Sequence, residues 1–253
     1  MTGRRRLAHL FYLLLFGLVT GCIAVAPQTN PQQDEKALAL IEQAKTFNSG
    51  IKTSKGVGRL ILKQGYQKEY YKMAWAAQTP NRLRLTLLLS GHPVETIAAS
   101  GDWVYFISHT GRHKRHSAVS TDPDLDPYLN IPVRLSEMIS LLLGQIPIRP
   151  FDRAWMSPEA PNLVMATASF SPHFQELQFD ESGRVLRYRL LNTNKELVFG
   201  IWYAKFKEKD GFDLPSAITI RDKSGRSLDI SLAGLTPNVK VKESTFRLTG
   251  SGS

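Results

Sequence analysis

The spacing of apolar residues predicts one helix followed by a long series of strands. The apolar positions of the helix recur at steps of three residues, at Leu38, Ile41, Ala44 and Phe47. Asp34 can cap the start of this segment, and Gly50 can end it. From residue 54 onward the period changes to two, as in segments 58–63, 70–77 and 82–87. That period is typical of strands.

Turn residues interrupt the period-two segments at intervals of about ten residues, which predicts an antiparallel meander with six strands before residue 120. Segment 122–132 contains three prolines and three aspartates and is expected to be irregular. Segment 135–143 is rich in Leu, Ile and Met and stops at Gly144, which predicts a short apolar helix. Further strands are predicted at 162–170, 174–179, 185–191, 196–206, 217–222, 228–232 and 244–248.

These elements predict a mainly β fold of the α+β class. We expect about 11–12 antiparallel strands in an unclosed barrel, with a helical lid over an apolar concave face. Segment 197–203 is apolar at nearly every position, so both faces of that strand are expected to be covered. This pattern allows either a solid core, as in a sandwich or a helix-covered sheet, or a half-barrel around an apolar cavity.

Composition is that of a globular protein, with 42% hydrophobic and 21% charged residues. The formal net charge is +10. The single cysteine excludes an internal disulfide and any site built from several cysteines. Neither a phosphate-binding G-x-x-x-x-G-K-[ST] motif nor a hydrolase G-x-S-x-G motif is present, so we expect neither an enzyme nor a cofactor.

The first 21 residues have the features of a bacterial export signal. Three arginines at 4–6 precede the apolar run 7–19, and Thr20-Gly21-Cys22 follows. Val19-Thr20-Gly21-Cys22 resembles the lipobox, which implies cleavage before Cys22 and attachment of a diacylglyceryl group to its thiol. The alternative is an incidental free cysteine. Export and acylation place the chain away from nucleic acid, although it is basic.

Four segments follow from this interpretation: a lipoprotein signal peptide (1–21), a flexible tether after the lipidated cysteine (22–33), a folded domain (34–248) and a disordered tail (249–253). The tether is rich in Pro, Gln and Asn, too polar to pack and too rich in proline for a helix. Ile23 stands where a common inner-membrane retention signal has Asp, which favours an outer-membrane location facing the periplasm.

Three segments of the domain resemble the LolA/LolB family of lipoprotein carriers and receptors. Segment 58–62 (Gly-Arg-Leu-Ile-Leu) is similar to the opening strand of the family, and 82–85 (Arg-Leu-Arg-Leu) to the strand before a protruding loop. Segment 131–147 is similar to the family's mid-chain helix, from Ile-Pro-Val to Gly-Gln-Ile-Pro. The predicted lipid anchor favours LolB, because LolA is soluble.

The resemblance implies an unclosed barrel that holds acyl chains, acting as a monomer that receives lipoprotein or lipid cargo from a periplasmic LolA-like carrier. The anchor would be the contact with the membrane. The residues expected to line the acyl-chain cavity are Leu60, Leu62, Trp75, Leu85, Leu87, Ile139, Leu142, Leu143, Phe199 and Ile201. Each of them is also a candidate for ordinary core.

A loop tip in LolB presents an exposed leucine to the membrane. Leu89 lies nearest to that position and Leu88 beside it, although the family's Pro-Leu-Gly is absent here. Arg112, Lys114 and Arg115 form a cationic tip expected to contact lipid headgroups or an acidic partner.

Two groups of side chains have spacings that could suit a metal ion, and neither is expected to bind one. Three histidines, at 109, 113 and 116, lie among the cations of that tip, which disfavour a bound dication. The aspartates at 122, 124 and 126 mimic the start of a calcium loop, but Pro127 and Val133 stand where that loop needs Gly and Glu.

The sequence is therefore consistent with two functions. The first is an acceptor or insertion factor for acylated cargo, which needs an apolar cavity and no catalytic group. The second is a structural or adaptor lipoprotein whose interior is filled by its own side chains. An open cavity under segment 135–144 would favour the first.

Overall fold

The computed structural model describes residues 34–112, 114–171 and 173–247, and the chain there begins with helix α2 (Glu35–Thr46). Asp34 caps this helix, because its carboxylate accepts hydrogen bonds from the backbone N–H of Lys36 (2.8 Å) and of Ala37 (3.3 Å). Ala37, Ile41 and Ala44 form the buried stripe. The predicted cap and helix are confirmed, but the helix ends at Thr46 with Phe47 as its C-cap, before the predicted end at Gly50.

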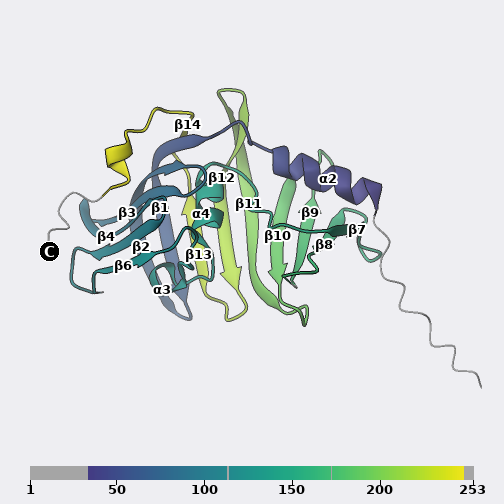
Figure 1. Ribbon diagram of the computed structural model, residues 1–253, viewed down its shortest axis with the longest axis horizontal. Helices are drawn as coiled ribbons and strands as arrows, with labels where there is room; N and C mark the ends of the chain where they lie inside the picture. Colours follow the sequence, from purple (N-terminus) through teal and green to yellow (C-terminus); the bar gives the residue numbers. More distant parts are fainter. Residues whose placement is uncertain (1–33, 113, 172, 248–253) are drawn as a thin grey trace, which may run out of the picture. The chain divides into compact units, whose positions relative to one another are not determined.

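Within the described residues, fourteen strands form one sheet. Figure 1 shows how they are arranged. In the first half of the chain they are β1 (Thr53–Gln64), β2 (Gln67–Gln78), β3 (Arg82–Leu89), β4 (His92–Ser100), β5 (Trp103–Ser108) and β6 (His116–Val119). In the second half they are β7 (Arg153–Met156), β8 (Leu163–Thr167), β9 (Phe174–Phe179), β10 (Val185–Leu191), β11 (Leu197–Lys209), β12 (Phe212–Asp222), β13 (Ser227–Ser231) and β14 (Thr236–Pro237).

The strand order is β6-β5-β4-β3-β2-β1-β13-β12-β11-β10-β9-β8-β7, and β14 pairs with the start of β1. All pairings are antiparallel, and β1 pairs with β13 to join the two meanders. Within the described residues β6 and β7 end the sheet without pairing with each other. The predicted unclosed antiparallel architecture is confirmed, with fourteen strands where about a dozen were expected.

Three helical segments lie between or beside the strands. They are α3 (Asp126–Leu129), α4 (Leu135–Leu142) and the 3-10 turn η2 (Glu243–Thr245). The predicted mid-chain helix is confirmed as α4, which packs on β2 and β3. Helix α2 packs on β7 and β8, and Figure 1 shows it beside them. The two longer helices thus cover separate parts of the sheet.

Three predictions from the strand pattern are wrong. Segment 244–248 was expected to be a strand, but its described residues include η2, because the buried Phe246 anchors a turn and no strand pairs there. The pattern missed the strands β7 and β14, which are only four and two residues long. It also missed α3, a single turn within the segment expected to be irregular. Short elements contain too few residues to show a period.

Side chains of both meanders and of the two longer helices form one hydrophobic cluster, which includes Ile41, Leu60, Met138, Phe199 and Leu228. One face of β11 is buried in this cluster, and the other face is only partly buried. Phe199 and Ile201 point into the cluster, while Trp202 lies over Gly200 on the other face, with the guanidinium of Arg221 5.9 Å from its ring. A side chain at Gly200 would meet that indole ring.

Candidate functional site

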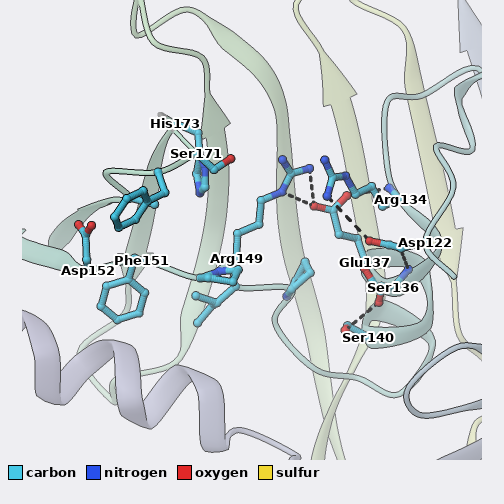
Figure 2. Close-up of a pocket in the computed structure, with 15 residues that line it drawn as sticks. Asp122, Arg134, Ser136, Glu137, Ser140, Arg149, Phe151, Asp152, Ser171 and His173 are labelled. Carbon is cyan, nitrogen blue, oxygen red and sulfur yellow. Dashed lines mark hydrogen bonds and ion pairs between the residues drawn. The ribbon is translucent and has the colours of Figure 1, made fainter.

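A pocket of about 550 Å³ lies where α4, the linker from α4 to β7 (residues 143–152) and the β8–β9 turn meet (Figure 2). Its volume is in the range of sites for small organic ligands. The apolar part of its wall consists of Pro147, Ile148, Pro150, Phe151, Ala168 and Phe170. The rest of the wall is polar and charged. The pocket is therefore amphipathic.

A buried ion pair stands in the charged wall. Glu137 of α4, with a side chain only 5% exposed, accepts hydrogen bonds from Arg149 Nε at 2.8 Å and from the backbone N–H of Arg134 at 2.8 Å. Burial raises the pKa of Glu137, although the neighbouring Arg149 acts in the opposite direction. Figure 2 shows Arg149 reaching across to Glu137, with Phe151 and His173 on the other side of the pocket.

The linker backbone is held onto the sheet by one side chain. The amide of Gln175, on β9, accepts from the backbone N–H of Arg149 (2.8 Å) and donates to its carbonyl (3.1 Å). Tyr188 on β10 donates to the same amide oxygen at 3.0 Å. Gln175 is fully buried, so these bonds satisfy groups that would otherwise be costly to bury. The position of Arg149 is therefore set by β9 and β10.

His173 closes the pocket beside the β8–β9 turn. It is 8% exposed, and its Nε2 has no hydrogen-bond partner among the described residues. Burial lowers the pKa of His173, and Arg149 and Arg134 lower it further. Its imidazole is therefore held in the neutral form around neutral pH.

A second pocket, of about 260 Å³, lies between α3 and the ends of β1, β2 and β3. Leu62, Leu87, Tyr71 and Tyr128 contribute its apolar surface. Arg112, from the β5–β6 turn, also lines this pocket.

The guanidinium of Arg112 donates to both carboxylate oxygens of Glu69, at 2.6 and 3.1 Å, and to the hydroxyl of Tyr71 at 3.2 Å. This bidentate pair ties the β5–β6 turn to β2. Both partners are partly exposed, so the pair contributes less than about 1 kcal/mol to stability.

The residues predicted to line an acyl-chain cavity all belong to the hydrophobic cluster, but most of them lie away from the two pockets. Leu62 and Leu87 line the 260 Å³ pocket, and Leu85 and Leu87 line a void of about 20 Å³ next to it. The other seven, Leu60, Trp75, Ile139, Leu142, Leu143, Phe199 and Ile201, are buried and line neither of the larger pockets. Their role in holding an acyl chain stays a prediction.

Two consecutive buried hydrogen bonds connect helix α4 to the sheet. Trp75 Nε1 donates to Ser54 Oγ (3.0 Å), and that hydroxyl donates to the carbonyl of Leu142 (2.7 Å). The C-terminal end of α4 is thereby bonded to β1 and β2, so its apolar side chains fill the space beneath it.

The other predicted site residues lie at turns or outside the described residues. Leu89 is 54% exposed at the β3–β4 turn, whereas Leu88 is half-buried. Lys114 and Arg115 are exposed in the β5–β6 turn, whereas Arg112 is engaged by Glu69. Cys22 and the predicted signal peptide and tether lie outside the described residues, as does the tail.

The two possible metal sites are also placed by the structure. His109 Nε2 lies 3.0 Å from Thr96 Oγ1, His116 stacks on Phe106, and His113 is outside the described residues. Asp122 accepts from the backbone of Ser136, at the start of α4. In the described part of the chain no three His, Cys, Asp or Glu side chains are grouped to hold a metal ion. Nor does any helix there have the length and apolarity needed to cross a membrane.

The sequence interpretation missed the residues that form the larger pocket. Glu137 is the only charged residue of α4, and Pro147 and Pro150 stand on either side of Arg149 within the linker. A lone acid in an apolar helix was the available signal, since a buried carboxylate requires a partner. Its partner could not be identified before the linker was placed.

No family model matches the sequence, and no curated protein matches it either. Solved structures with a similar fold do exist. A DUF1329 family protein from Desulfovibrio piger is 9% identical with a TM-score of 0.59, and the match covers 84% of this chain and 96% of that one.

Two further structures have more explicit descriptions. A putative outer membrane lipoprotein-sorting protein domain from Vibrio parahaemolyticus is 13% identical, with a TM-score of 0.51 over 84% of this chain and 96% of its own. A LolA superfamily protein from Nitrosomonas europaea is 12% identical, with a TM-score of 0.53 over 84% and 97%. This chain therefore has the LolA-like fold, a large antiparallel sheet that remains an open barrel.

Proposed function

We propose that this protein is a noncatalytic receptor for acylated cargo. Anchored as a monomer to the outer membrane by a lipid on Cys22 and facing the periplasm, it takes lipoproteins or other acylated molecules from a soluble LolA-like carrier. It then passes them into the membrane. The lipobox at Cys22 supports the anchor, and Ile23 supports the outer-membrane location.

The amphipathic 550 Å³ pocket carries this proposal. Phe151, Phe170 and Ile148 offer apolar surface to an acyl chain, and each CH₂ group that they bury contributes about 0.8 kcal/mol. The opposite wall, with Glu137 and Arg149, offers polar groups to the part of the cargo that joins the chain. Binding of this kind needs neither an acid nor a base. The acyl chain can leave the pocket for the bilayer, because the bilayer interior is an equally apolar solvent.

The fold supports the same class of function. One protein with this fold is described as a putative lipoprotein-sorting domain and another as a member of the LolA superfamily. In the acceptor function, Leu89 at the β3–β4 turn is the membrane-insertion residue, with Leu88 behind it. Arg112, Lys114 and Arg115 are then the residues that contact headgroups.

A second function, that of a structural adaptor, is favoured by one specific observation. Seven of the ten residues expected around an acyl chain are buried in the hydrophobic core, three of them on α4 or at its C-terminal cap, and α4 is bonded to the sheet through Ser54. An adaptor needs a solid interior and would use its surface only.

The two functions differ in what the intact protein contains. After mild detergent extraction of the lipidated protein, native mass spectrometry should detect bound acylated molecules in addition to the protein's own anchor. Depletion of the protein should leave other lipoproteins in the inner membrane. An interior that is consistently empty, together with a tightly bound protein partner, would instead support the adaptor.

A further inference from the structure

The turns of the sheet form two rims with opposite charge. Because neighbouring strands are antiparallel, successive turns alternate between the two edges of the sheet. Figure 1 shows this alternation in the β11–β12 turn at the top and the β12–β13 turn at the bottom. The turns on one edge, here named the basic rim, are 65–66, 90–91, 109–115, 168–173, 192–196 and 223–226. Those on the other edge, the acidic rim, are 79–81, 101–102, 157–162, 180–184 and 210–211.

Lysine and arginine are concentrated on the basic rim, in the residues Arg112, Lys114, Arg115, Lys195, Lys223 and Arg226, and Glu196 is its single acid. On the acidic rim the pattern is reversed. That rim has the acids Asp102, Glu159, Asp180, Glu181 and Asp210, and the single base Arg184. The two sets of turns alternate along the sequence, so their charges become separated only when the sheet has folded.

Four cations of the basic rim are available to a partner. Arg112 is paired with Glu69, and Arg226 with Asp222 and Asp126. The other four are exposed and form no ion pair within the described part of the chain; they are Lys114, Arg115, Lys195 and Lys223. Of these, Lys195 also lies over the ring of Phe174, at 5.4 Å.

Three large side chains project from the same rim. Tyr66 is 106% exposed at the β1–β2 turn, Phe170 is 103% exposed at the β8–β9 turn, and Leu89 is at the end of β3. Exposed apolar residues also occur on the acidic rim, where Trp103 and Val119 lie. Scattered exposed residues are ordinary. Among the described turn residues, the basic rim combines them with cations that form no ion pair, whereas the single base of the acidic rim, Arg184, is paired with Asp180 and Asp213.

Both pockets adjoin the basic rim. Phe170, Ser171 and His173 of the β8–β9 turn line the 550 Å³ pocket. Arg112 of the β5–β6 turn lines the 260 Å³ pocket, with Gln64 and Gln67 on either side of the β1–β2 turn. An acyl chain that leaves either pocket past these turns therefore emerges at the basic rim, next to its cations and its three large exposed side chains.

We propose that the basic rim is the surface that lies against a bilayer containing anionic phospholipids, with Tyr66 and Phe170 in the interface beside Leu89. Unpaired lysine and arginine near an anionic membrane are attracted to it, and amphipathic rings such as that of Tyr favour the headgroup level. The proposed function involves only Leu88, Leu89 and the β5–β6 cations. This inference adds an orientation for the whole domain, and it rests on the proposed function only for the discharge of a chain from the pockets.

Position-specific labels test the orientation in the intact lipidated protein. Cys22 is the only cysteine and is acylated under the proposal, so Tyr66→Cys and Phe170→Cys can each receive one environment-sensitive fluorophore. The control is Val119→Cys, an exposed apolar position on the acidic rim, and the unsubstituted chain is the blank. In vesicles of phosphatidylethanolamine and phosphatidylglycerol, the labels at 66 and 170 should shift to the blue and the label at 119 should not.

Charge reversal tests the electrostatic part. In a variant with both Lys195→Glu and Lys223→Glu, the equilibrium constant for docking on the membrane, measured with the label at 66, should decrease by at least about fivefold for each replaced lysine. Lys36→Glu with Lys52→Glu, exposed on other elements, should leave it unchanged. Phosphatidylcholine vesicles should give a smaller shift than the anionic ones.

The inference would be overturned if the labels at 66 and 170 kept the emission that they have in water. It would also be overturned if the emission of the label at 119 shifted by the same amount as theirs. A label at 66 that responds to an acidic protein but not to vesicles would also overturn it. The proposed function has a separate readout, since bound acylated cargo is measured by native mass spectrometry without any vesicle.

Discussion

Arg149 Nε donates a hydrogen bond to Glu137 Oε1 at 2.8 Å, and this buried pair joins α4 to the linker that returns to the sheet. The linker is fixed from the other side by Gln175. Helix, linker and sheet therefore meet at one ion pair, which is also a wall of the larger pocket. The geometry of that pocket depends on the pair.

Replacing Arg149 by alanine should destabilise the domain strongly. Glu137 would remain buried without its partner, and we expect the free energy of unfolding to fall by about 3 kcal/mol. Urea denaturation measures the change. Arg153→Ala is the matched control, since Arg153 is exposed and forms no ion pair with other described residues. A loss equal to that of the control would show that the pair has no structural role.

His173 should make stability depend on pH. Its pKa in the folded state is lowered from 6.5, so as the pH falls below that value the unfolded chain binds a proton before the folded chain does. Stability from this residue is therefore present above pH 6.5 and is lost on acidification. Denaturation of the protein and of His173→Gln between neutral and mildly acidic pH should show a steeper loss for the unsubstituted chain.

The control for that comparison is His116→Gln, because His116 is exposed. Equal pH slopes for the unsubstituted protein and His173→Gln would contradict the assignment.

Filling the larger pocket should weaken the binding of acyl chains. Ala168 is half-buried in its wall, and Ala168→Trp would occupy the space next to Phe151. We expect about a tenfold loss of affinity for a fluorescent fatty acid, since about 1.4 kcal/mol of apolar contact would be removed. Ala118→Trp on β6, also half-buried and away from the larger pockets, should bind as the unsubstituted protein does. Unchanged binding by Ala168→Trp would place the acyl chain elsewhere.

A charge at the exposed tip of β3 should slow delivery of cargo. Leu89→Glu places a carboxylate at a position that must enter the headgroup region if Leu89 acts in insertion. Transfer of a labelled lipoprotein into vesicles should become slower, while loading of the receptor stays normal. Val119→Glu, on the acidic rim, should deliver at the normal rate. Delivery by Leu89→Glu at the normal rate would remove this residue from the mechanism.

Local signals in the sequence determined most of the elements. The three-residue apolar period and Asp34 were enough for α2, and period-two segments separated by turn residues were enough for most strands and for an open antiparallel sheet. These features depend on hydrogen bonds and side-chain directions within a few residues, so they are present in the linear pattern. The alternation at 244–248 misled because an alternating segment becomes a strand only if a neighbouring strand is available to pair with it.

The surroundings of the candidate site depend on contacts between distant parts of the chain. Leu60 and Phe199 were equally suited to a cavity or a core, and both are buried in the one hydrophobic cluster that the two meanders and the helices form together. Glu137, Arg149 and Gln175 become partners across distant parts of the chain, and the cations of the basic rim come together because the turns alternate between two edges. Packing and long-range pairing set these relationships, and neither leaves a periodic trace in the sequence.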